Sequence, residues 1–440
     1  MRLDRSLMHQ LTAWKNRETR KPLILKGARQ VGKTWLLKRF GELHFEDVAY
    51  FNFDLQQDIK SFFEQTKEPG KLIEYLSIVR GRRIIAGTSL LILDEIQECN
   101  AALNSLKYFK ELMPEMHVVA AGSLLGVTMA RGSSFPVGMV DFLTLYPLSF
   151  NEFITATDPA IAAYLGGLNF LEPIPEYFYN QLKDSLKSYF ISGGMPEAVD
   201  NWLQQKDVAS LQQIQQNILD AYTLDFSKHA DNREVNRIQY IWNAIPSQLA
   251  KENKKFIYHA VKPGARAREY EDALTWLEQA GLVYKINAIS KPGLPLSAYD
   301  DLSAFKVYFC DVGLLGRMAG LNPASLYAGN QLFAEFKGAL TENFVLQSLI
   351  PLLDKQPRYW RSDSQAEVDF IIQINQQVIP VEVKSDENVR SKSLAMYRKK
   401  YNPGIALRCS LQPLKQDDGL INTPLFLMER TLDFLNSNTS

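Results

Sequence analysis

The chain of 440 residues has little cysteine and no excess of charge of either sign. Its three cysteines, Cys99, Cys310 and Cys409, are odd in number and far apart, so they indicate neither a disulfide framework nor paired metal ligands. This usage favours a reducing compartment, and we expect a cytoplasmic protein. Lys and Arg number 49, as do Asp and Glu. The balance excludes a polyelectrolyte that binds nucleic acid by bulk charge, so any attraction to phosphate must come from local patches.

The sequence also lacks long hydrophobic runs. No uncharged apolar run approaches the roughly 18 residues of a membrane span, and the opening residues carry charges throughout, unlike a signal peptide. Hydrophobic residues make up 46% and charged residues 22%, which excludes a disordered or collagen-like chain. At roughly 150 residues per domain, the length suggests about three globular domains without a membrane segment.

The first third of the chain alternates short apolar runs with helical patterns. Apolar residues at helical spacing from Leu3 to Trp14 predict an opening amphipathic helix. Strand-like runs follow at 22–26, 48–53, 89–96, 117–122 and 141–150. Strands that alternate with helices indicate βαβ units and a parallel sheet covered on both faces. We therefore predict an α/β domain over 1–155.

The remaining chain divides into three segments by pattern. Over 156–233 the strand signal fades, and helical patterns broken near Gly193 and Pro196 predict a helical subdomain. Over 234–325 two helices precede a strand, a Pro/Gly-rich loop and a second strand, an order that suggests a winged helix. Over 326–440 a helical run precedes several strand-like runs, which predicts a further α/β domain.

Residues 27–34, GARQVGKT, match the phosphate-binding pattern G-x-x-x-x-G-K-[ST]. Glycines let such a loop curl so that backbone N–H groups surround a β-phosphate. Lys33 would reach the β- and γ-phosphate oxygens, the hydroxyl of Thr34 would hold Mg²⁺, and the following helix would turn its positive end toward the anion. The ATP-binding residues predicted here are Gly27, Ala28, Arg29, Gln30, Val31, Gly32, Lys33 and Thr34.

Two acids stand at the carboxyl end of the strand-like run LLILDE. Asp94 would hold Mg²⁺ through water, and Glu95 would orient and deprotonate the attacking water. Ser123 follows the next strand-like run and would contact the γ-phosphate or the water. The alternatives are a solvated strand exit for the acids and an ordinary loop serine. With the phosphate loop, the pattern predicts a Mg²⁺-dependent ATP hydrolase with Lys33, Glu95 and Ser123 in catalytic roles.

These motifs together resemble one group of prokaryotic AAA+-type ATPases. The motifs that carry the resemblance are GARQVGKT (27–34), LDEIQ (93–97), AGS (121–123), FPVG (135–138), L-x-P-L-S-F-x-E-F (145–153) and SGGMPEAV (192–199). The resemblance implies a P-loop ATPase core, a winged-helix-like middle, and a C-terminal domain of unknown function with a restriction-endonuclease-like fold.

One position departs from that group. Many members have an arginine directly after PVG, where this chain has Met139. If that arginine acts on a neighbouring subunit's nucleotide, this chain lacks it or uses another, and Arg131, Arg233 and Arg237 are the candidates. Assembly into an oligomer, which is common among such enzymes, therefore stays open.

A second group of acids lies near the C-terminus, where Asp369, Glu382 and Lys384 follow the spacing D-x₁₂-E-x-K. Side chains alternate along a strand, so Glu382 and Lys384 would share a face, and Asp369 on a neighbouring strand would join Glu382 around Mg²⁺. Glu342 on the preceding helical run would add a further metal ligand, and Lys384 would polarise the attacking water. The pattern resembles the PD-(D/E)xK nucleases, and the alternative is a solvated strand face.

Local basic patches favour nucleic acid as a partner. The segment 251–268 has six Lys or Arg against one acid, and a second patch comprises Arg390, Lys392, Arg398, Lys399 and Lys400. Solvated helix faces are the alternative. We predict ATP hydrolysis that drives or gates a DNA-binding, nuclease-like C-terminal half, with DNA favoured over RNA and cleavage left open. The rival hypothesis is a nucleotide-gated switch that grips nucleic acid or a protein partner without cleaving it.

Overall fold

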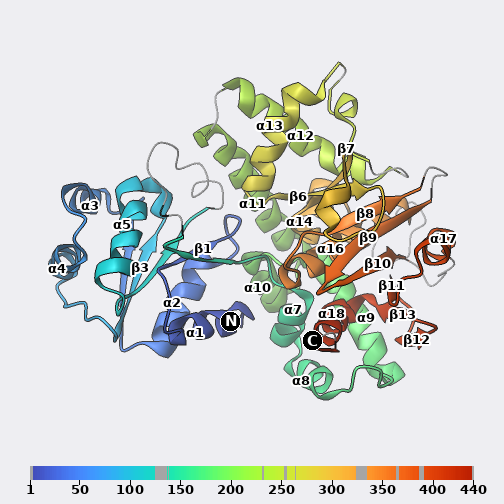
Figure 1. Ribbon diagram of the computed structural model, residues 1–440, viewed down its shortest axis with the longest axis horizontal. Helices are drawn as coiled ribbons and strands as arrows, with labels where there is room; N and C mark the ends of the chain where they lie inside the picture. The colour runs from blue at the N-terminus through green and yellow to red at the C-terminus, as the bar shows by residue number, and fades with distance from the viewer. Residues whose placement is uncertain are drawn as a thin grey trace. The chain divides into compact units, whose positions relative to one another are not determined.

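The computed structural model describes most of the chain, in two compact units (Figure 1). The described residues are 3–123, 136, 138–229, 232–251, 255–262, 264–323, 334–362, 366–385 and 391–438. The first unit comprises Asp4–Tyr146 with Gln279–Leu282, and the second comprises Met1–Leu3, Pro147–Glu278 and Val283–Ser440.

A five-stranded sheet with strand order β2-β3-β4-β1-β5 forms the centre of the first unit. Its strands are β1 (Leu23–Lys26), β2 (Asp47–Asn52), β3 (Ser89–Asp94), β4 (His117–Ala121) and β5 (Asp141–Thr144). All four pairings between them are parallel. Strand β3 is buried over its whole length, as expected when helices cover both faces of a parallel sheet. The predicted α/β class and the parallel sheet are therefore confirmed.

Helices cover both faces of this sheet (Figure 1). They are α1 (Leu7–Asn16), α2 (Lys33–His44), α3 (Lys60–Gln65), α4 (Pro69–Arg80) and α5 (Asn100–Leu112), with the short turns η1 (Gln57–Ile59) and η2 (Ile96–Glu98). On one face, Leu91 and Leu93 of β3 share a buried core with Leu72 of α4 and Leu106 of α5. On the other, α2 packs against β2, β3 and β4. The burial of apolar side chains from both faces holds the strand ends in fixed positions.

The second unit contains an eight-stranded mixed sheet with strand order β12-β13-β11-β10-β9-β8-β6-β7. Its strands are β6 (Val283–Ile289), β7 (Asp300–Phe309), β8 (Arg358–Arg361), β9 (Glu367–Ile374), β10 (Gln377–Val383), β11 (Ala406–Ser410), β12 (Lys415–Asp417) and β13 (Leu420–Pro424). Neighbours β6–β7, β8–β9, β9–β10 and β12–β13 are antiparallel, whereas β6–β8, β10–β11 and β11–β13 are parallel.

The helices of the second unit precede, interrupt and follow this sheet. They are α7 (Phe150–Thr157), α8 (Pro159–Gly167), α9 (Glu176–Ser192), α10 (Pro196–Gln205), α11 (Val208–His229), α12 (Asn232–Leu249), α13 (Ala267–Gln279), α14 (Val312–Met318), α16 (Ala334–Leu349), α17 (Lys392–Tyr401) and α18 (Met428–Asn438). Short turns lie at η3 (Tyr258–Ala260), η4 (Leu296–Tyr299), η6 (Ile350–Leu352) and η7 (Leu425–Leu427). None of these helices, as far as the structure describes them, is long and apolar enough to cross a membrane.

The pairing of β6 with β8 joins two segments that the sequence pattern separates. Ala288 pairs with Tyr359 and Ile289 with Trp360. Strands β6 and β7 of the predicted winged-helix segment therefore belong to the same sheet as the strands of the predicted C-terminal domain. The four predicted segments are gathered into two compact units, and the winged helix stays a prediction. Pairing between distant strands leaves no local signal in a sequence, which is why the pattern did not indicate it.

The SGGMP segment after α9 is held by buried polar contacts. The N–H of Gly194 donates to Oδ2 of Asp311 at 2.6 Å, and its carbonyl oxygen accepts from the N–H of Leu148 at 2.6 Å. A Cβ at Gly194 would lie 2.2 Å from the carbonyl oxygen of Leu148, so glycine is required there. Asp311 also caps α14 by accepting from the N–H of Leu314. These contacts fix the entry of the chain into the second unit.

Candidate functional site

The predicted phosphate loop connects the carboxyl end of β1 to the first residue of α2. A Cβ at Gly27 would lie 2.3 Å from the carbonyl oxygen of Leu145, so the chain can pass there only as glycine. Gln30 and Gly32 have positive φ angles of 65° and 92°, and α2 begins at Lys33. A loop that curls in this way into a helix N-terminus presents backbone N–H groups to an anion. The residues predicted to bind phosphate therefore have the local geometry that this role needs.

The side chain of Lys33 lies over the loop to which it belongs. Its Nζ donates to the carbonyl oxygens of Gly27 at 3.0 Å and Ala28 at 2.9 Å. These bonds hold the ammonium beside the cradle of N–H groups. A cation in this position is suited to the oxygens of a bound phosphate.

The carboxylate of Asp94 lies at the end of β3 and is directed toward the same loop. Its Oδ2 accepts from the hydroxyl of Thr34 at 2.7 Å and from that of Tyr50 at 2.8 Å, and its Oδ1 accepts from the N–H of Glu95 at 3.1 Å. Because parallel strands end at one edge of the sheet, side chains 60 residues apart in the sequence meet there. A hydroxyl and a carboxylate at this separation are the hard oxygen donors that Mg²⁺ prefers, so Thr34 and Asp94 fit that cation.

Glu95 adopts an unusual backbone conformation directly after β3. Its φ of 51° lies in the left-handed region, which non-glycine residues adopt at a cost. Its Oε2 accepts from Nε2 of Gln97 at 2.5 Å. Strained backbone of this kind is concentrated at functional sites, and here it occurs at the residue directly after Asp94.

Ser123 follows β4, which lies between β3 and β1 in the sheet. The N–H of the preceding Gly122 donates to the carbonyl oxygen of Leu25 at 3.4 Å, which keeps this turn beside β1. Ser123 is therefore at the same sheet edge as the loop and Asp94, while its contact with a γ-phosphate stays a prediction.

The arginine candidates stay predictions. Arg131 lies outside the described residues, and Arg233 and Arg237 lie on α12 of the second unit. Met139 is half-buried, and its N–H donates to the carbonyl oxygen of Pro136.

Two residues that the sequence pattern did not indicate support this site. Tyr50 is one, and burial together with the nearby Asp94 and Glu95 raises its pKa to about 12, so its hydroxyl stays a donor. Arg5 is the other: it is buried, and its guanidinium donates to the carbonyl oxygens of Val31 at 3.0 Å and Tyr146 at 2.5 Å. Tyr50 could have been predicted from the sequence, because it lies on a strand-like run next to the one that ends in Asp94. Arg5 could not, because its contacts are with residues distant in the sequence.

The second predicted group of acids lies on the eight-stranded sheet. Strands β9 and β10 are antiparallel with Val381 opposite Phe370, so the register places Asp369 opposite Glu382. Oδ2 of Asp369 accepts from the N–H of Val383 at 2.8 Å. The structure thus brings these two acids onto one face of neighbouring strands.

Lys384 lies directly beyond β10 on the same face as Glu382. Its Nζ is 2.8 Å from Oε1 of Glu382, and that oxygen also accepts from the hydroxyl of Ser391 at 2.8 Å. Oε2 of Glu382 is buried and has no hydrogen-bond partner among the described residues. The first oxygen of this carboxylate is therefore shared between a lysine and a serine, and only the second is without a partner.

A lysine that the sequence pattern missed joins this group from β7. Lys306 is fully buried, and its Nζ lies 2.5 Å from Oε1 of Glu367 and 3.9 Å from Oε2 of Glu342. These are ion-pair distances, although neither contact has the geometry of a hydrogen bond. Oε2 of Glu342 also accepts from the hydroxyl of Tyr308 at 3.1 Å. Burial alone lowers the pKa of Lys306, but the neighbouring Tyr308 and the surrounding carboxylates outweigh it and raise the pKa well above its ordinary value.

These contacts bear on the divalent cation that the nuclease pattern implies. In the described parts of the chain, no three His, Cys, Asp or Glu side chains come close enough to hold a metal ion. Glu342 faces Lys306 and Tyr308, and Glu382 faces Lys384. The described residues thus show no cluster of three such side chains at Glu342, Asp369 and Glu382, and lysine ammoniums lie beside Glu342 and Glu382, so the metal centre stays a prediction.

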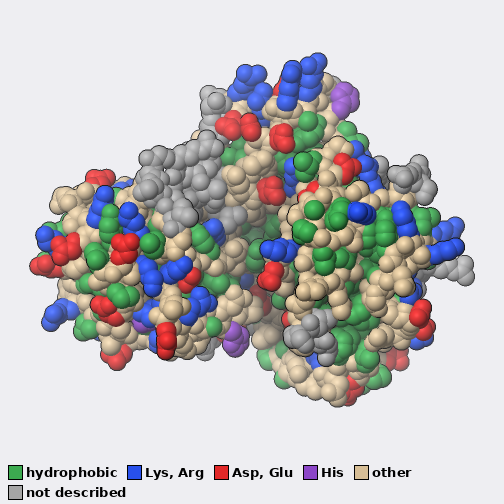
Figure 2. Space-filling view, viewed as in Figure 1, with side chains coloured by type: hydrophobic (Ala, Val, Ile, Leu, Met, Phe, Trp, Pro, Cys, Tyr) green, Lys and Arg blue, Asp and Glu red, His purple; other side chains and the backbone are tan. Residues whose placement is uncertain are grey.

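Basic side chains are present where the sequence pattern indicates nucleic acid. The last turn of α17 carries Arg398, Lys399 and Lys400, and Figure 2 shows Lys and Arg side chains gathered there. Arg398 lies 3.3 Å from a carboxylate oxygen of Asp418. Arg390 lies outside the described residues, as do 252–254 and 263 of the other predicted patch.

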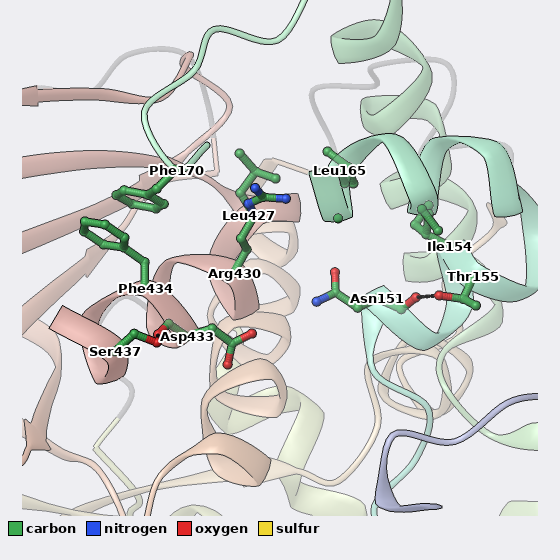
Figure 3. Close-up of a pocket in the computed structure, with 12 residues that line it drawn as sticks. Asn151, Ile154, Thr155, Leu165, Phe170, Leu427, Arg430, Asp433, Phe434 and Ser437 are labelled. Carbon is green, nitrogen blue, oxygen red and sulfur yellow. Dashed lines mark hydrogen bonds between the residues drawn. The ribbon is translucent and has the colours of Figure 1, made fainter. Parts of the chain in front are cut away.

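A separate cavity of about 520 Å³ lies between α7, α8 and α18 (Figure 3). The stacked rings of Phe170 and Phe434 form one side, and Asn151, Ile154 and Leu165 form another. It shares no residue with either predicted site, so it adds nothing to their assignment.

Comparison with known families agrees with the loop geometry. Residues 19–154 match a family model described as an AAA domain. This stretch of the first unit, which includes the loop at 27–34 and Asp94, is therefore similar to AAA domains and supports an ATPase-like P-loop domain. Residues 183–325 and 337–428 match families described as domains of unknown function, DUF8612 and DUF4143. The nuclease-like and winged-helix predictions are not confirmed by these matches.

Several solved structures resemble the chain weakly. A Walker-type ATPase of Pyrococcus abyssi has 13% identity over 72% of this chain and 96% of its own, with a TM-score of 0.47. The ORC1 protein of Aeropyrum pernix in complex with DNA has 12% identity over 71% and 90%, with a TM-score of 0.30. DnaA from Aquifex aeolicus bound to AMPPCP has 16% identity over 61% and 75%, with a TM-score of 0.29. No curated protein matches the chain. At these scores the structural likeness carries no argument, and the assignment rests on the family match and the site.

Proposed function

We propose that this protein is a Mg²⁺-dependent ATP hydrolase whose nucleotide state gates a nucleic-acid-binding C-terminal half. One observation carries the first part of the proposal. The hydroxyl of Thr34 and the carboxylate of Asp94 lie 2.7 Å apart beside a loop that also holds the ammonium of Lys33. Hydroxyl, carboxylate and ammonium are the three groups that a Mg²⁺-bound triphosphate requires.

Each side chain has a distinct role in this proposal. The N–H groups of 27–34 bind the β-phosphate, and Lys33 binds the β- and γ-phosphate oxygens. Thr34 and Asp94 hold Mg²⁺, which when bound neutralises phosphate charge. Glu95 accepts a proton from the attacking water, and Gln97 restrains its carboxylate before reaction.

Gating follows from where these residues lie. Glu95 and Ser123 stand on the turns after β3 and β4, so contacts to a γ-phosphate would order both turns and hydrolysis would release them. We propose that the C-terminal half responds to this change in the two turns. Its proposed partner is a nucleic acid, because the basic last turn of α17 supplies phosphate contacts without bulk charge, and DNA is the first polymer to test. A protein partner is the alternative.

The Glu95→Gln variant tests the hydrolase. It should bind a fluorescent ATP analogue as the wild type does, while turnover falls by about 100-fold or more because the water loses its base. Glu98→Gln is the matched control, since Glu98 is exposed three residues further on. If Glu95→Gln hydrolysed ATP at the wild-type rate, the assignment of the base would be wrong.

Fluorescence anisotropy with duplex DNA, single-stranded DNA and RNA tests the second part. Affinity should depend on whether ATP or ADP is bound, and the slope of log affinity against log salt should fall by about one to two in Lys399→Ala/Lys400→Ala. Lys187→Ala on α9, whose lysine pairs with Asp184, serves as the control. Absence of salt-dependent binding to all three probes would favour the protein partner.

Cleavage of nucleic acid is a second candidate function. The buried oxygen of Glu382 without a partner, opposite Asp369, is the observation that favours it. Labelled DNA cut in the presence of Mg²⁺ by the wild type and left intact by Asp369→Ala would establish cleavage. Tight binding without cutting would establish the gated binding module.

A further inference from the structure

The charges around Lys306 come from two different family domains. Lys306 lies within the match at 183–325, whereas the carboxylates of Glu342, Glu367 and Asp369 that surround it lie within the match at 337–428. Strand β7 nevertheless brings the ammonium to 2.5 Å from Glu367 and 3.9 Å from Glu342. A positive charge from the preceding domain is therefore placed inside the acidic group of the following one.

This ammonium is placed as a counter-ion. Its side chain is 1% exposed, and that of Glu342 is 9% exposed, so both charges are removed from water. A buried carboxylate without a compensating charge is strongly unfavourable, and an adjacent ammonium supplies that compensation. The ring of Tyr359, 5.0 Å from Nζ, offers its face to the same cation. The carboxylates of Glu342 and Glu367 and the ring of Tyr359 thus all favour a positive charge at this point.

A divalent cation needs the same carboxylates. It would have to approach Glu342 beside the ammonium of Lys306 and Glu382 beside that of Lys384, which lies 2.8 Å from Oε1. Like charges at such separations repel strongly inside a protein. The remaining buried oxygen of Glu382 is a single ligand, and Mg²⁺ needs several oxygen donors in near-octahedral geometry.

We propose that Lys306 is a built-in counter-cation that takes the place of a divalent metal ion in the nuclease-like acidic group. The C-terminal half then binds nucleic acid without cutting it. This inference rests on the proposed function and deepens it, since it decides whether the C-terminal half only binds nucleic acid or also cleaves it. Its test uses no nucleotide, so its failure would leave the ATP-hydrolase proposal untouched.

Binding of Mn²⁺ to the full-length, nucleotide-free protein tests the proposal, with free Mn²⁺ followed by electron paramagnetic resonance. Wild type and Glu382→Gln should bind the same number of ions, because the acids are already neutralised. One ion more in the wild type than in Glu382→Gln would overturn the proposal. This comparison decides the matter even where the lysine variants do not fold.

Removal of the lysine should open the site. Lys306→Met should bind one additional Mn²⁺, at least 10-fold tighter than any binding at this site in the wild type, and Lys306→Met/Glu382→Gln should lose it. Lys285→Met, on the adjacent strand β6, removes a lysine that lies over Phe305 and should gain nothing. Where Lys306→Met does not fold alone, Lys306→Met/Glu367→Gln removes both members of the closest ion pair and is measured instead. A folded variant without the extra ion would contradict the proposal.

Discussion

Two groups of buried carboxylates in this molecule differ in what lies beside them: one is surrounded by neutral hydrogen-bond donors and the other by lysine ammoniums. At the edge of the parallel sheet, Asp94 accepts from the hydroxyls of Thr34 and Tyr50 and from a backbone N–H. No Lys or Arg of the described chain forms an ion pair with it. In the second unit, Glu342 of α16 and Glu382 of β10 lie beside lysine ammoniums instead.

The difference separates a binding site from a part of the fold. A carboxylate surrounded by neutral donors keeps its charge available for a cation that arrives with a ligand. A carboxylate beside a buried lysine has its charge compensated already. Asp94 and Glu382 look alike in the sequence, since each stands near the end of an apolar strand-like run, and only the neighbouring elements distinguish them.

Glu429 on α18 shows a third arrangement, in which a proton compensates the charge. It is fully buried, and it accepts from the hydroxyl of Ser149 at 2.8 Å and from the N–H of Asn151 at 3.3 Å. Burial is the largest cause that raises its pKa to about 7, and the nearby carboxylate of Glu152 adds to it. Near neutral pH this side chain is therefore partly protonated.

The largest expected effect is on stability, in Lys306→Met. Without the lysine, the acids of the mixed sheet are buried and uncompensated, so the free energy of unfolding in metal-free buffer should fall by about 3–5 kcal/mol. Urea denaturation measures it. Asp94→Asn should stay within about 1 kcal/mol of the wild type, because it keeps neutral hydrogen-bonding groups. Equal losses in both variants would remove the distinction between the two groups.

Lys33→Ala should lose ATP affinity and keep its stability, whereas Lys306→Met should lose stability. ATP affinity should fall by at least about 100-fold, because the phosphates lose their charge-assisted bonds, while stability should change by less than about 1 kcal/mol. Isothermal titration with ATP and Mg²⁺ measures the affinity. The control is Lys71→Ala, an exposed lysine of the same unit that pairs with Glu68. Undiminished affinity would show that Lys33 is structural.

The Glu429→Gln variant tests the third arrangement through pH. Because the folded pKa is raised from 4.5 to about 7, the stabilisation is complete below pH 4.5 and is lost as the pH rises through about 7. Over that window the wild type should lose roughly 3 kcal/mol relative to Glu429→Gln. Thermal unfolding from pH 4 to pH 8 measures the difference. A constant difference across that range would mean that Glu429 stays ionised.

The smallest expected effect belongs to Tyr50→Phe. Asp94 would lose one of three donors, which should weaken Mg²⁺-ATP binding or slow turnover by less than about 10-fold, or about 1 kcal/mol. Steady-state ATP hydrolysis measures it. Tyr75→Phe, whose ring packs 5.4 Å from Phe62 on the same unit, is the control and should have no effect. A loss as large as that of Lys33→Ala would make Tyr50 a direct ligand-binding residue.

Much of the first unit was predictable because its signals are local. The first four predicted strands match β1 to β4 within about one or two residues, since apolar runs between Gly, Pro and helical patterns leave few alternatives. The fifth run, 141–150, was expected to be stopped by Pro147, and it is shorter than that. There the strand ends at Thr144, and Ser149 and Glu152 form a capping box that begins α7. The S-x-x-E spacing is the sequence signal of this helix start.

The acidic group of the second unit was predictable only in part. The alternation along β9 and β10 placed Asp369, Glu382 and Lys384 on one face. Lys306 stands in the apolar run AFKVYFCD, where a single lysine resembles an ordinary solvent-facing strand residue. Its burial depends on α16 and β9, which follow it in the sequence. One sequence carries no record of such distant contacts.

The sheet shared by β6 and β8 limits where related genes can recombine and still encode a folded protein. The two families of unknown function meet between 325 and 337, yet the strands on either side of that boundary pair with one another. A recombination event at this boundary would separate two paired strands and expose a sheet edge that is prone to aggregation. It would also leave one member of a buried ion pair without its partner. When related genes recombine, the segments that encode these two regions should therefore be inherited together.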